Sequence, residues 1–197
     1  MFLSSFLMSP LRLIFGLFGT LLLILLIIVG GTVVLAFTGG PGPCTPGGGP
    51  IAVSAANADA FDGKWDSFNA TLDGGSAATV NFNESEISSF VGREVGDPFS
   101  DPRVCIHDGS GEGTATLEIL GFDAKIKVKG NMDLTGTHPV AKIDDIEVGN
   151  VPGFVTGFVE NFVEDAIEDE TKKVDLDHPV TPTLTEGDAK LDGTPKP

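Results

Sequence analysis

The longest apolar stretch of the chain lies near the N-terminus. Residues 13–37 contain no charged side chain, and Arg12 directly precedes them. Because a helix of about 20 apolar residues crosses the hydrocarbon layer of a bilayer, this pattern predicts a transmembrane helix over 13–37. Positive charge favours the cytoplasmic side, so residues 1–12 are predicted as a short cytoplasmic segment. A cleaved signal peptide is the alternative, although its apolar region usually has only about 7–15 residues.

Helical spacing of apolar residues returns after a segment rich in glycine and proline. That segment predicts a linker over 38–56, since proline removes hydrogen-bond donors and glycine makes order costly. The apolar positions Phe61, Trp65, Phe68 and Leu72 then lie on one face of a predicted helix. A short strand over 78–82 follows. A second helix is predicted after this strand, and it begins at a capping box formed by Asn83 and Glu86.

From residue 104 onward the period changes to two. The clearest strand has Phe122, Ala124, Ile126 and Val128 on one face and charged residues on the other. Together with the segments before and after it, this strand predicts an antiparallel meander. Its last strand covers 140–148, with Val140, Ile146 and Val148 on one face. The predicted extracytoplasmic domain covers 57–180, and residues 181–197 are predicted as a flexible tail.

A third helix is predicted from Pro152, with a wide apolar stripe and an acidic opposite face. The stripe consists of Phe154, Val155, Phe158, Val159, Phe162 and Val163. Two interpretations remain open. Either the stripe packs fully on the sheet, or it lines an apolar groove with Phe122, Ile126 and Val128 that admits acyl chains.

The charge balance excludes one class of partner. The chain has 28 acidic residues against 12 lysines and arginines, which gives a formal net charge of −16. Nucleic-acid binding depends on clustered basic residues, and the lysines at 125, 127 and 129 are more simply a solvated strand face. An acidic surface also disfavours adhesion to anionic lipid. Any lipid contact is therefore expected through an apolar interior.

The two cysteines, Cys44 and Cys105, allow one disulfide in a domain that faces an oxidising compartment. Two unpaired thiols are the alternative, and the spacing alone does not decide between them. If the bond forms, it joins the linker to the body of the domain.

No catalytic or metal motif is complete. Cys105, His107 and Asp108 lack the further ligands that zinc needs. The segment from Asp108 to Gly113 has the early oxygens and glycine of a calcium loop, but Ile119 stands where a bidentate glutamate belongs. Nucleophile, phosphate-loop and dinucleotide motifs are missing as well. The sequence therefore predicts a protein that is not an enzyme, with neither cofactor nor metal.

The order of these elements resembles that of a known family. The segments at 80–90, 126–130 and 146–155 follow an N-terminal anchor, and this arrangement is similar to bacterial TULIP-like (tubular lipid-binding) proteins of the LmeA-like and YpmS-like kinds. Ser88 stands where that family has asparagine at the helix start. The resemblance implies an α+β fold in which a curved antiparallel sheet wraps around amphipathic helices. It also implies a role in binding or moving lipid outside the cytoplasmic membrane.

Two functions follow as hypotheses. The first is an anchored, single-pass, extracytoplasmic domain that binds membrane lipid or another apolar ligand in the groove. The alternative is a non-enzymatic structural or interaction protein of the cell envelope, with a fully packed core and an envelope protein as partner. The oligomeric state does not follow from the sequence.

Overall fold

The computed structural model describes residues 40–119, 121–134, 139–173 and 176–196. The chain divides into two units, Met1–Thr38 and Gly39–Pro197, and all described residues belong to the second. The transmembrane helix predicted over 13–37 lies outside the described residues. Among the helices that are described, none is long and apolar enough to span a bilayer.

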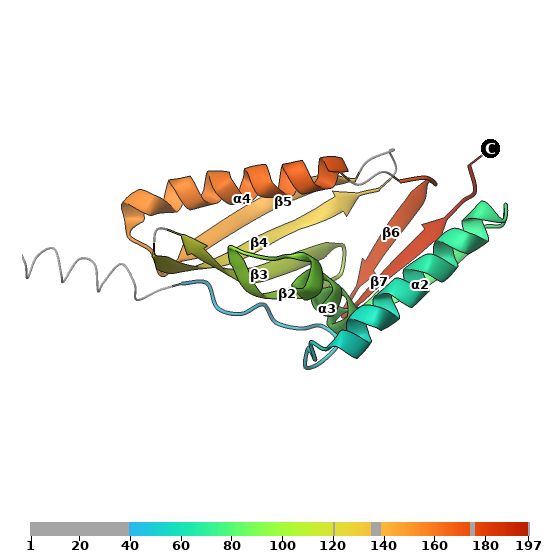
Figure 1. The fold of residues 1–197 in the computed structure, drawn as a ribbon, viewed down its shortest axis with the longest axis horizontal. Coiled ribbons are helices and arrows are strands. Elements are labelled where there is room, and N and C mark those ends of the chain that lie inside the picture. Colours follow the sequence, from blue (N-terminus) through green and yellow to red (C-terminus); the bar gives the residue numbers. More distant parts are fainter. Residues whose placement is uncertain (1–39, 120, 135–138, 174–175, 197) are drawn as a thin grey trace, which may run out of the picture. The chain divides into compact units, whose positions relative to one another are not determined.

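The second unit has α+β architecture (Figure 1). Its elements are α2 (Ala55–Asp73), β1 (Ala78–Asn83), α3 (Glu84–Glu94), β2 (Phe99–His107), β3 (Ser110–Ile119), β4 (Phe122–Asp133), β5 (Val140–Gly149), α4 (Gly153–Lys173), β6 (Val180–Thr185) and β7 (Asp188–Gly193). The three helices predicted after the linker and the antiparallel meander are confirmed, and α2 begins slightly earlier than the predicted end of the linker.

The strands form two antiparallel sheets instead of the single curved sheet that the resemblance to TULIP-like proteins implies. One sheet has the order β2-β3-β4-β5, which is the predicted meander, and the other has the order β1-β7-β6. Strand β1, which α3 separates from the meander in the chain, pairs with the last strand, β7.

The prediction of a flexible tail over 181–197 is wrong. Residues 180–193 form the β6–β7 hairpin, and β7 is the central strand of its sheet. The buried residues of β7 include Ala189, whose small side chain produces only a weak apolar alternation in the sequence. Pro182 lies in β6, where an edge strand tolerates a missing N–H donor.

Each sheet packs against its own helix. Val155, Val159 and Val163 of α4 form a buried cluster with residues of β3 and β4, and Figure 1 shows α4 along β4 and β5. Phe68 and Leu72 of α2 belong to a second cluster with residues of β1, β6 and β7. The domain therefore has two hydrophobic clusters, one between each sheet and its helix.

Two helices begin at residues whose side chains cap the backbone, and one of these caps is predicted from the sequence. The Asn83 side chain accepts a hydrogen bond from the Glu86 N–H, and the Glu86 carboxylate accepts one from the Asn83 N–H. This reciprocal arrangement is the predicted capping box. At the start of α2, Ser54 accepts from the Asn57 N–H. Both helices thus begin with a backbone donor satisfied.

The strand predicted near residues 140–148 is present as β5, but Val140 does not share the buried face. It is 55% exposed. The β4–β5 register shifts between Lys129 and Gly130, so Gly130 pairs with Ile143 whereas Lys129 pairs with Asp145. Because side chains alternate with a period of two, the extra residue in β5 turns Val140 to the opposite face.

The central position of β7 predicts the effect of one substitution. Leu191→Ala leaves a cavity in the cluster beneath α2, since Leu191 is 9% exposed, and it should lower the free energy of unfolding by about 2–4 kcal/mol. Urea denaturation of the full chain in detergent, followed by the near-ultraviolet circular dichroism of Trp65, measures this change. The exposed Thr183→Ala in β6 is the matched control, with an expected change within about 0.5 kcal/mol. Equal midpoints for the two variants would contradict the packed position of Leu191.

Candidate functional site

The apolar site predicted from the sequence lies between α4 and the four-stranded sheet, and its central residues are packed. Val155, Val159 and Val163 are 3%, 0% and 4% exposed. They share one buried cluster with Leu117 of β3 and Ile126 of β4. Because these residues recur every four positions, they form one row along α4. The valines of the predicted stripe therefore face the sheet and belong to the hydrophobic core.

Further predicted residues lie at the margin of this cluster. Val128 of β4 and Phe162 of α4 are partly buried and pack against it. The Phe162 ring stacks against that of Phe99 in β2, with ring centroids 6.2 Å apart. The aromatic pair thus extends the contact of α4 to the first strand of the sheet.

Phe158 differs from the valine row. It is 56% exposed, although the sequence places it among the groove-lining residues. It immediately precedes Val159, and consecutive residues of a helix point about 100° apart. The side chains of Phe122 and Phe154, also predicted for the groove, lie outside the described residues. Phe158 is therefore an apolar side chain on the solvent side of α4.

The C-terminal part of α4 carries a polar pair on its surface. The Nζ atom of Lys172 lies 2.7 Å from a Glu168 carboxylate oxygen. This hydrogen bond lowers the pKa of the Glu168 carboxyl and raises the pKa of Lys172. Both groups are exposed, so the pair belongs to the solvated face of the helix and not to the apolar site.

The predicted linker is bound to the domain over its described part. We define the strap as residues 40–54. Near its start, a β-carbon at Gly40 would lie 3.4 Å from Lys125 Cβ. Cys44 forms a disulfide with Cys105 of β2, with Cα atoms 5.9 Å apart. The pairing that the sequence left open is therefore present, and both residues are buried. The strap lies on the face of the sheet that carries Lys125 and Cys105, opposite α4.

The firmest polar contact of the strap is with Glu84, the first residue of α3. Glu84 is 3% exposed, and its carboxylate accepts hydrogen bonds from three backbone N–H groups: Gly47 at 2.9 Å, Gly48 at 3.1 Å and Ile106 of β2 at 2.8 Å. Its own N–H donates to the carbonyl of Gly187, in the β6–β7 turn. A buried carboxylate is costly unless such donors satisfy it, so Glu84 joins four segments of the chain.

The rest of the strap is held by serines of α3. The Ala52 N–H donates to Ser85 Oγ, and the Ser54 N–H donates to Ser89 Oγ. Ser88 accepts a hydrogen bond from the Val104 N–H of β2. The most deeply buried residues of α3 are polar: Glu84, Glu86, Ser88 and Ser89. The apolar side of the helix is only partly buried, with Ile87 against the second apolar cluster and the Phe90 ring stacked on Phe61.

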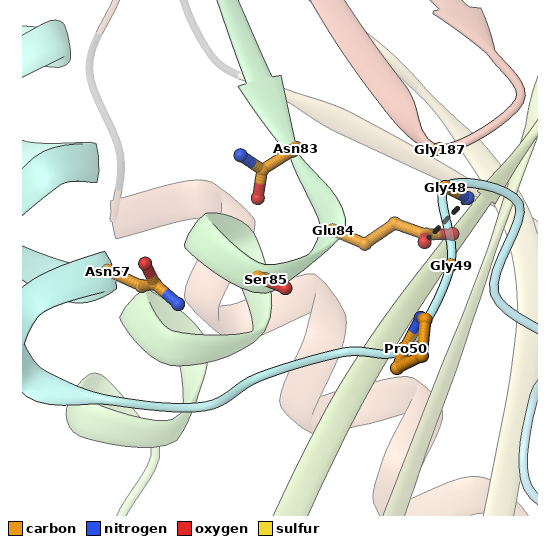
Figure 2. Close-up of a pocket in the computed structure, with 8 residues that line it drawn as sticks. All are labelled: Gly48, Gly49, Pro50, Asn57, Asn83, Glu84, Ser85 and Gly187. Atoms are coloured by element: carbon orange, nitrogen blue, oxygen red, sulfur yellow. Dashed lines mark hydrogen bonds between the residues drawn. The ribbon is translucent and has the colours of Figure 1, made fainter.

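A hollow of about 370 Å³ lies beside Glu84. It is lined by strap residues 48–50, Asn57 of α2, residues 83–85 and Gly187. Figure 2 shows the Glu84 side chain reaching from the start of α3 to the backbone of Gly48. The Asn57 side-chain amide donates to the Ala52 carbonyl. Because its polar side chains are already hydrogen-bonded within the chain, this hollow offers no set of free ligands.

A second hollow, of about 490 Å³, lies between α2 and β1. It is lined by residues 60–71 of α2 and 78–80 of β1. Its charged residue, Lys64, donates to the Glu86 carboxylate at 2.7 Å and to the Asn81 carbonyl at 2.9 Å. Neither of these two hollows lies beneath α4, where the sequence predicts the groove.

The remaining chemical candidates lie in or next to the β2–β3 hairpin. Cys105 is in the disulfide, so it provides no thiolate for the zinc interpretation with His107 and Asp108. His107 Nδ1 instead lies 3.2 Å from a Glu186 carboxylate oxygen. The segment from Asp108 to Gly113 forms the β2–β3 turn and the start of β3. Within the described residues, no group of three or more histidine, cysteine or acidic side chains could hold a metal ion.

Sequence patterns alone do not identify Glu84 as a buried contact. Glu84 follows Asn83 at the start of a helix. Acidic residues are common there because the helix dipole favours negative charge, so the sequence indicates nothing more specific for Glu84. The only sequence feature that points to this contact is the pair of consecutive glycines at 47 and 48. A carboxylate can approach two consecutive backbone N–H groups closely where side chains are small, but the partner of these glycines is distant in the sequence.

Comparisons with protein-family models, curated proteins and solved structures give no match for this chain. The site is therefore interpreted from its own geometry.

The disulfide predicts a redox-dependent stability. It closes a segment with a sequence separation of 61 residues, and restriction of the unfolded chain should stabilise the domain by about 4 kcal/mol. Addition of dithiothreitol should lower the urea midpoint of the full chain. The double variant Cys44→Ser/Cys105→Ser is the control, because the reductant should leave its midpoint unchanged. An unaltered midpoint in the reduced parent chain would contradict the bond or its effect.

Proposed function

We propose that this chain is a membrane-anchored, extracytoplasmic structural or interaction module with a filled core. The burial of Val155, Val159 and Val163 against the sheet is the observation that supports this function best. An acyl chain between α4 and the sheet would need the space that these side chains occupy, and protein interiors are close-packed. The apolar stripe of α4 thus serves the core.

The proposed role is binding and not catalysis. Glu84, Ser88 and Ser89 are buried polar residues of α3, and each is engaged with backbone groups of the strap or of β2. Such residues stabilise a fold, whereas a catalytic site needs polar groups directed at a substrate. The expected partner is an envelope protein with a basic surface, because the chain carries 28 acidic residues against 12 basic ones.

The proposed location rests on two features, the uncharged N-terminal run and the disulfide. The uncharged run over 13–37 follows Arg12, which favours a cytoplasmic N-terminus. Beyond the run, the Cys44–Cys105 disulfide suits an oxidising compartment outside the cytoplasm.

Lipid binding is a second candidate, and Phe158 favours it. This residue is 56% exposed on the helix that also carries the partly buried Phe162. If α4 belongs to a TULIP-like fold, as the resemblance implies, an acyl chain would lie along the phenylalanine side of α4. Each buried methylene of the chain would then contribute about 0.8 kcal/mol.

Native mass spectrometry of the full chain, extracted gently from cells in mild detergent, separates the two candidates. The filled core predicts the mass of the bare protein as the dominant species. A lipid of fixed mass at a stoichiometric level would instead favour lipid binding. Phe158→Ala is the control: loss of the adduct would place the lipid at α4, whereas an unchanged adduct would place it elsewhere, such as at the anchor.

The proposed topology has its own test. In spheroplasts, an added protease should remove a tag fused after Pro197, because the domain is predicted to lie outside the cytoplasmic membrane. A tag at the N-terminus should remain intact until detergent opens the membrane. Protection of the C-terminal tag would show the opposite orientation.

A further inference from the structure

Glu84 contacts the chain next to both cysteines. Its carboxylate accepts N–H bonds from Gly47, three residues after Cys44, and from Ile106, the neighbour of Cys105. One buried side chain therefore holds the strap and β2 together at the place where the disulfide joins them.

We propose that Glu84 is a latch that docks the strap on β2 without the disulfide and thereby brings Cys44 beside Cys105 for oxidation. This inference concerns the domain alone and does not depend on its partner or on the membrane anchor.

The energetics favour docking before oxidation. If the strap left the domain, the Glu84 carboxylate would lose two of its three backbone donors, the N–H groups of Gly47 and Gly48. Hydrogen bonds to an ionised group are stronger than neutral ones, and a buried charge without donors is costly. The strap is therefore bound by contacts that exist whether the cysteines are oxidised or reduced.

The backbone fits closely at this point. A β-carbon at Gly47 would lie 2.6 Å from the Gly187 nitrogen and 2.7 Å from the Ile106 oxygen. Real side chains do not tolerate such approaches, so glycine is required for the strap to reach the carboxylate. Gly42, by contrast, has open space at its β-carbon position.

The oxidation itself needs a disulfide oxidant, such as oxidised glutathione. One protein thiolate attacks the glutathione disulfide and forms a mixed disulfide, with release of one glutathione thiolate. The second protein thiolate then attacks the protein sulfur and releases the other. The two cysteine protons pass to solvent or to the departing thiolates. A docked strap accelerates the second step by raising the effective concentration of one thiolate near the other.

Hydrogen–deuterium exchange of the full chain in detergent tests the docking. In Cys44→Ser/Cys105→Ser, the amides of Gly47, Gly48 and Ile106 should stay protected. Addition of Glu84→Gln should raise their exchange rates roughly tenfold or more, because glutamine lacks the charge and offers one acceptor fewer. Glu86→Gln is the matched control, since Glu86 is a buried carboxylate of the same helix that binds Lys64 and caps α3. It should leave strap exchange unchanged.

The rate of disulfide formation gives the second readout. The reduced full chain is mixed with oxidised glutathione, and the reaction is quenched by alkylation at intervals. Glu84→Gln should slow closure of the protein disulfide from the mixed disulfide roughly tenfold, whereas Glu86→Gln should match the parent chain.

The near-ultraviolet signal of Trp65 reports whether Glu84→Gln disturbs the fold. If it does, a second pair of variants tests the proposal: Gly47→Ala, with Gly42→Ala as its control. Gly47→Ala displaces the strap with Glu84 intact, so it should slow closure, and Gly42→Ala should not. Rapid strap exchange in the cysteine-free chain with Glu84 present would overturn the latch. Parent-like closure in both Glu84→Gln and Gly47→Ala would overturn it as well.

Discussion

The buried carboxylate of Glu84 is the contact on which the arrangement of this domain depends. A charge removed from water needs donors, and Glu84 obtains them from the strap and from β2, while its own backbone binds the β6–β7 turn. The Gly187 N–H in that turn donates to the Ile106 carbonyl. The strap, the junction of β1 with α3, strand β2 and the last hairpin therefore meet around one side chain. Nothing apolar could replace it, because backbone donors from separate segments converge there.

The two apolar layers have a different role from the polar contacts of Glu84. One lies between α2 and the three-stranded sheet, and the other lies between α4 and the four-stranded sheet. Each layer stabilises its own sheet, whereas the polar contacts of α3 fasten the strap and β2. This division explains why the described part of an acidic chain buries several polar side chains: they hold the strap, which is rich in glycine and proline and has little apolar surface of its own.

Much of the fold follows from periodicity in the sequence. The spacing of Phe61, Trp65, Phe68 and Leu72 predicts α2, and the alternation around Ile126 predicts the meander, because burial on one face repeats with the period of the element. The C-terminal hairpin was missed since its buried positions include alanine and glycine, which carry little apolar signal. Val140 was placed on the wrong face because a register shift depends on pairing between strands.

The candidate site was predictable only in part. The valines of α4 do face the sheet, since helical spacing states which residues share a face. The same spacing does not state how closely the next layer approaches, so it could not separate a groove from a core. It also could not find Glu84, whose partners are 37, 36 and 22 residues away.

Nuclear Overhauser contacts from the Val159 methyl groups of the full chain test the central claim most directly. The filled core predicts contacts to the methyl groups of Ile126 and Leu117, which share its buried cluster. Contacts from Val159 to acyl-chain protons of a copurified lipid, with those to Ile126 absent, would contradict it.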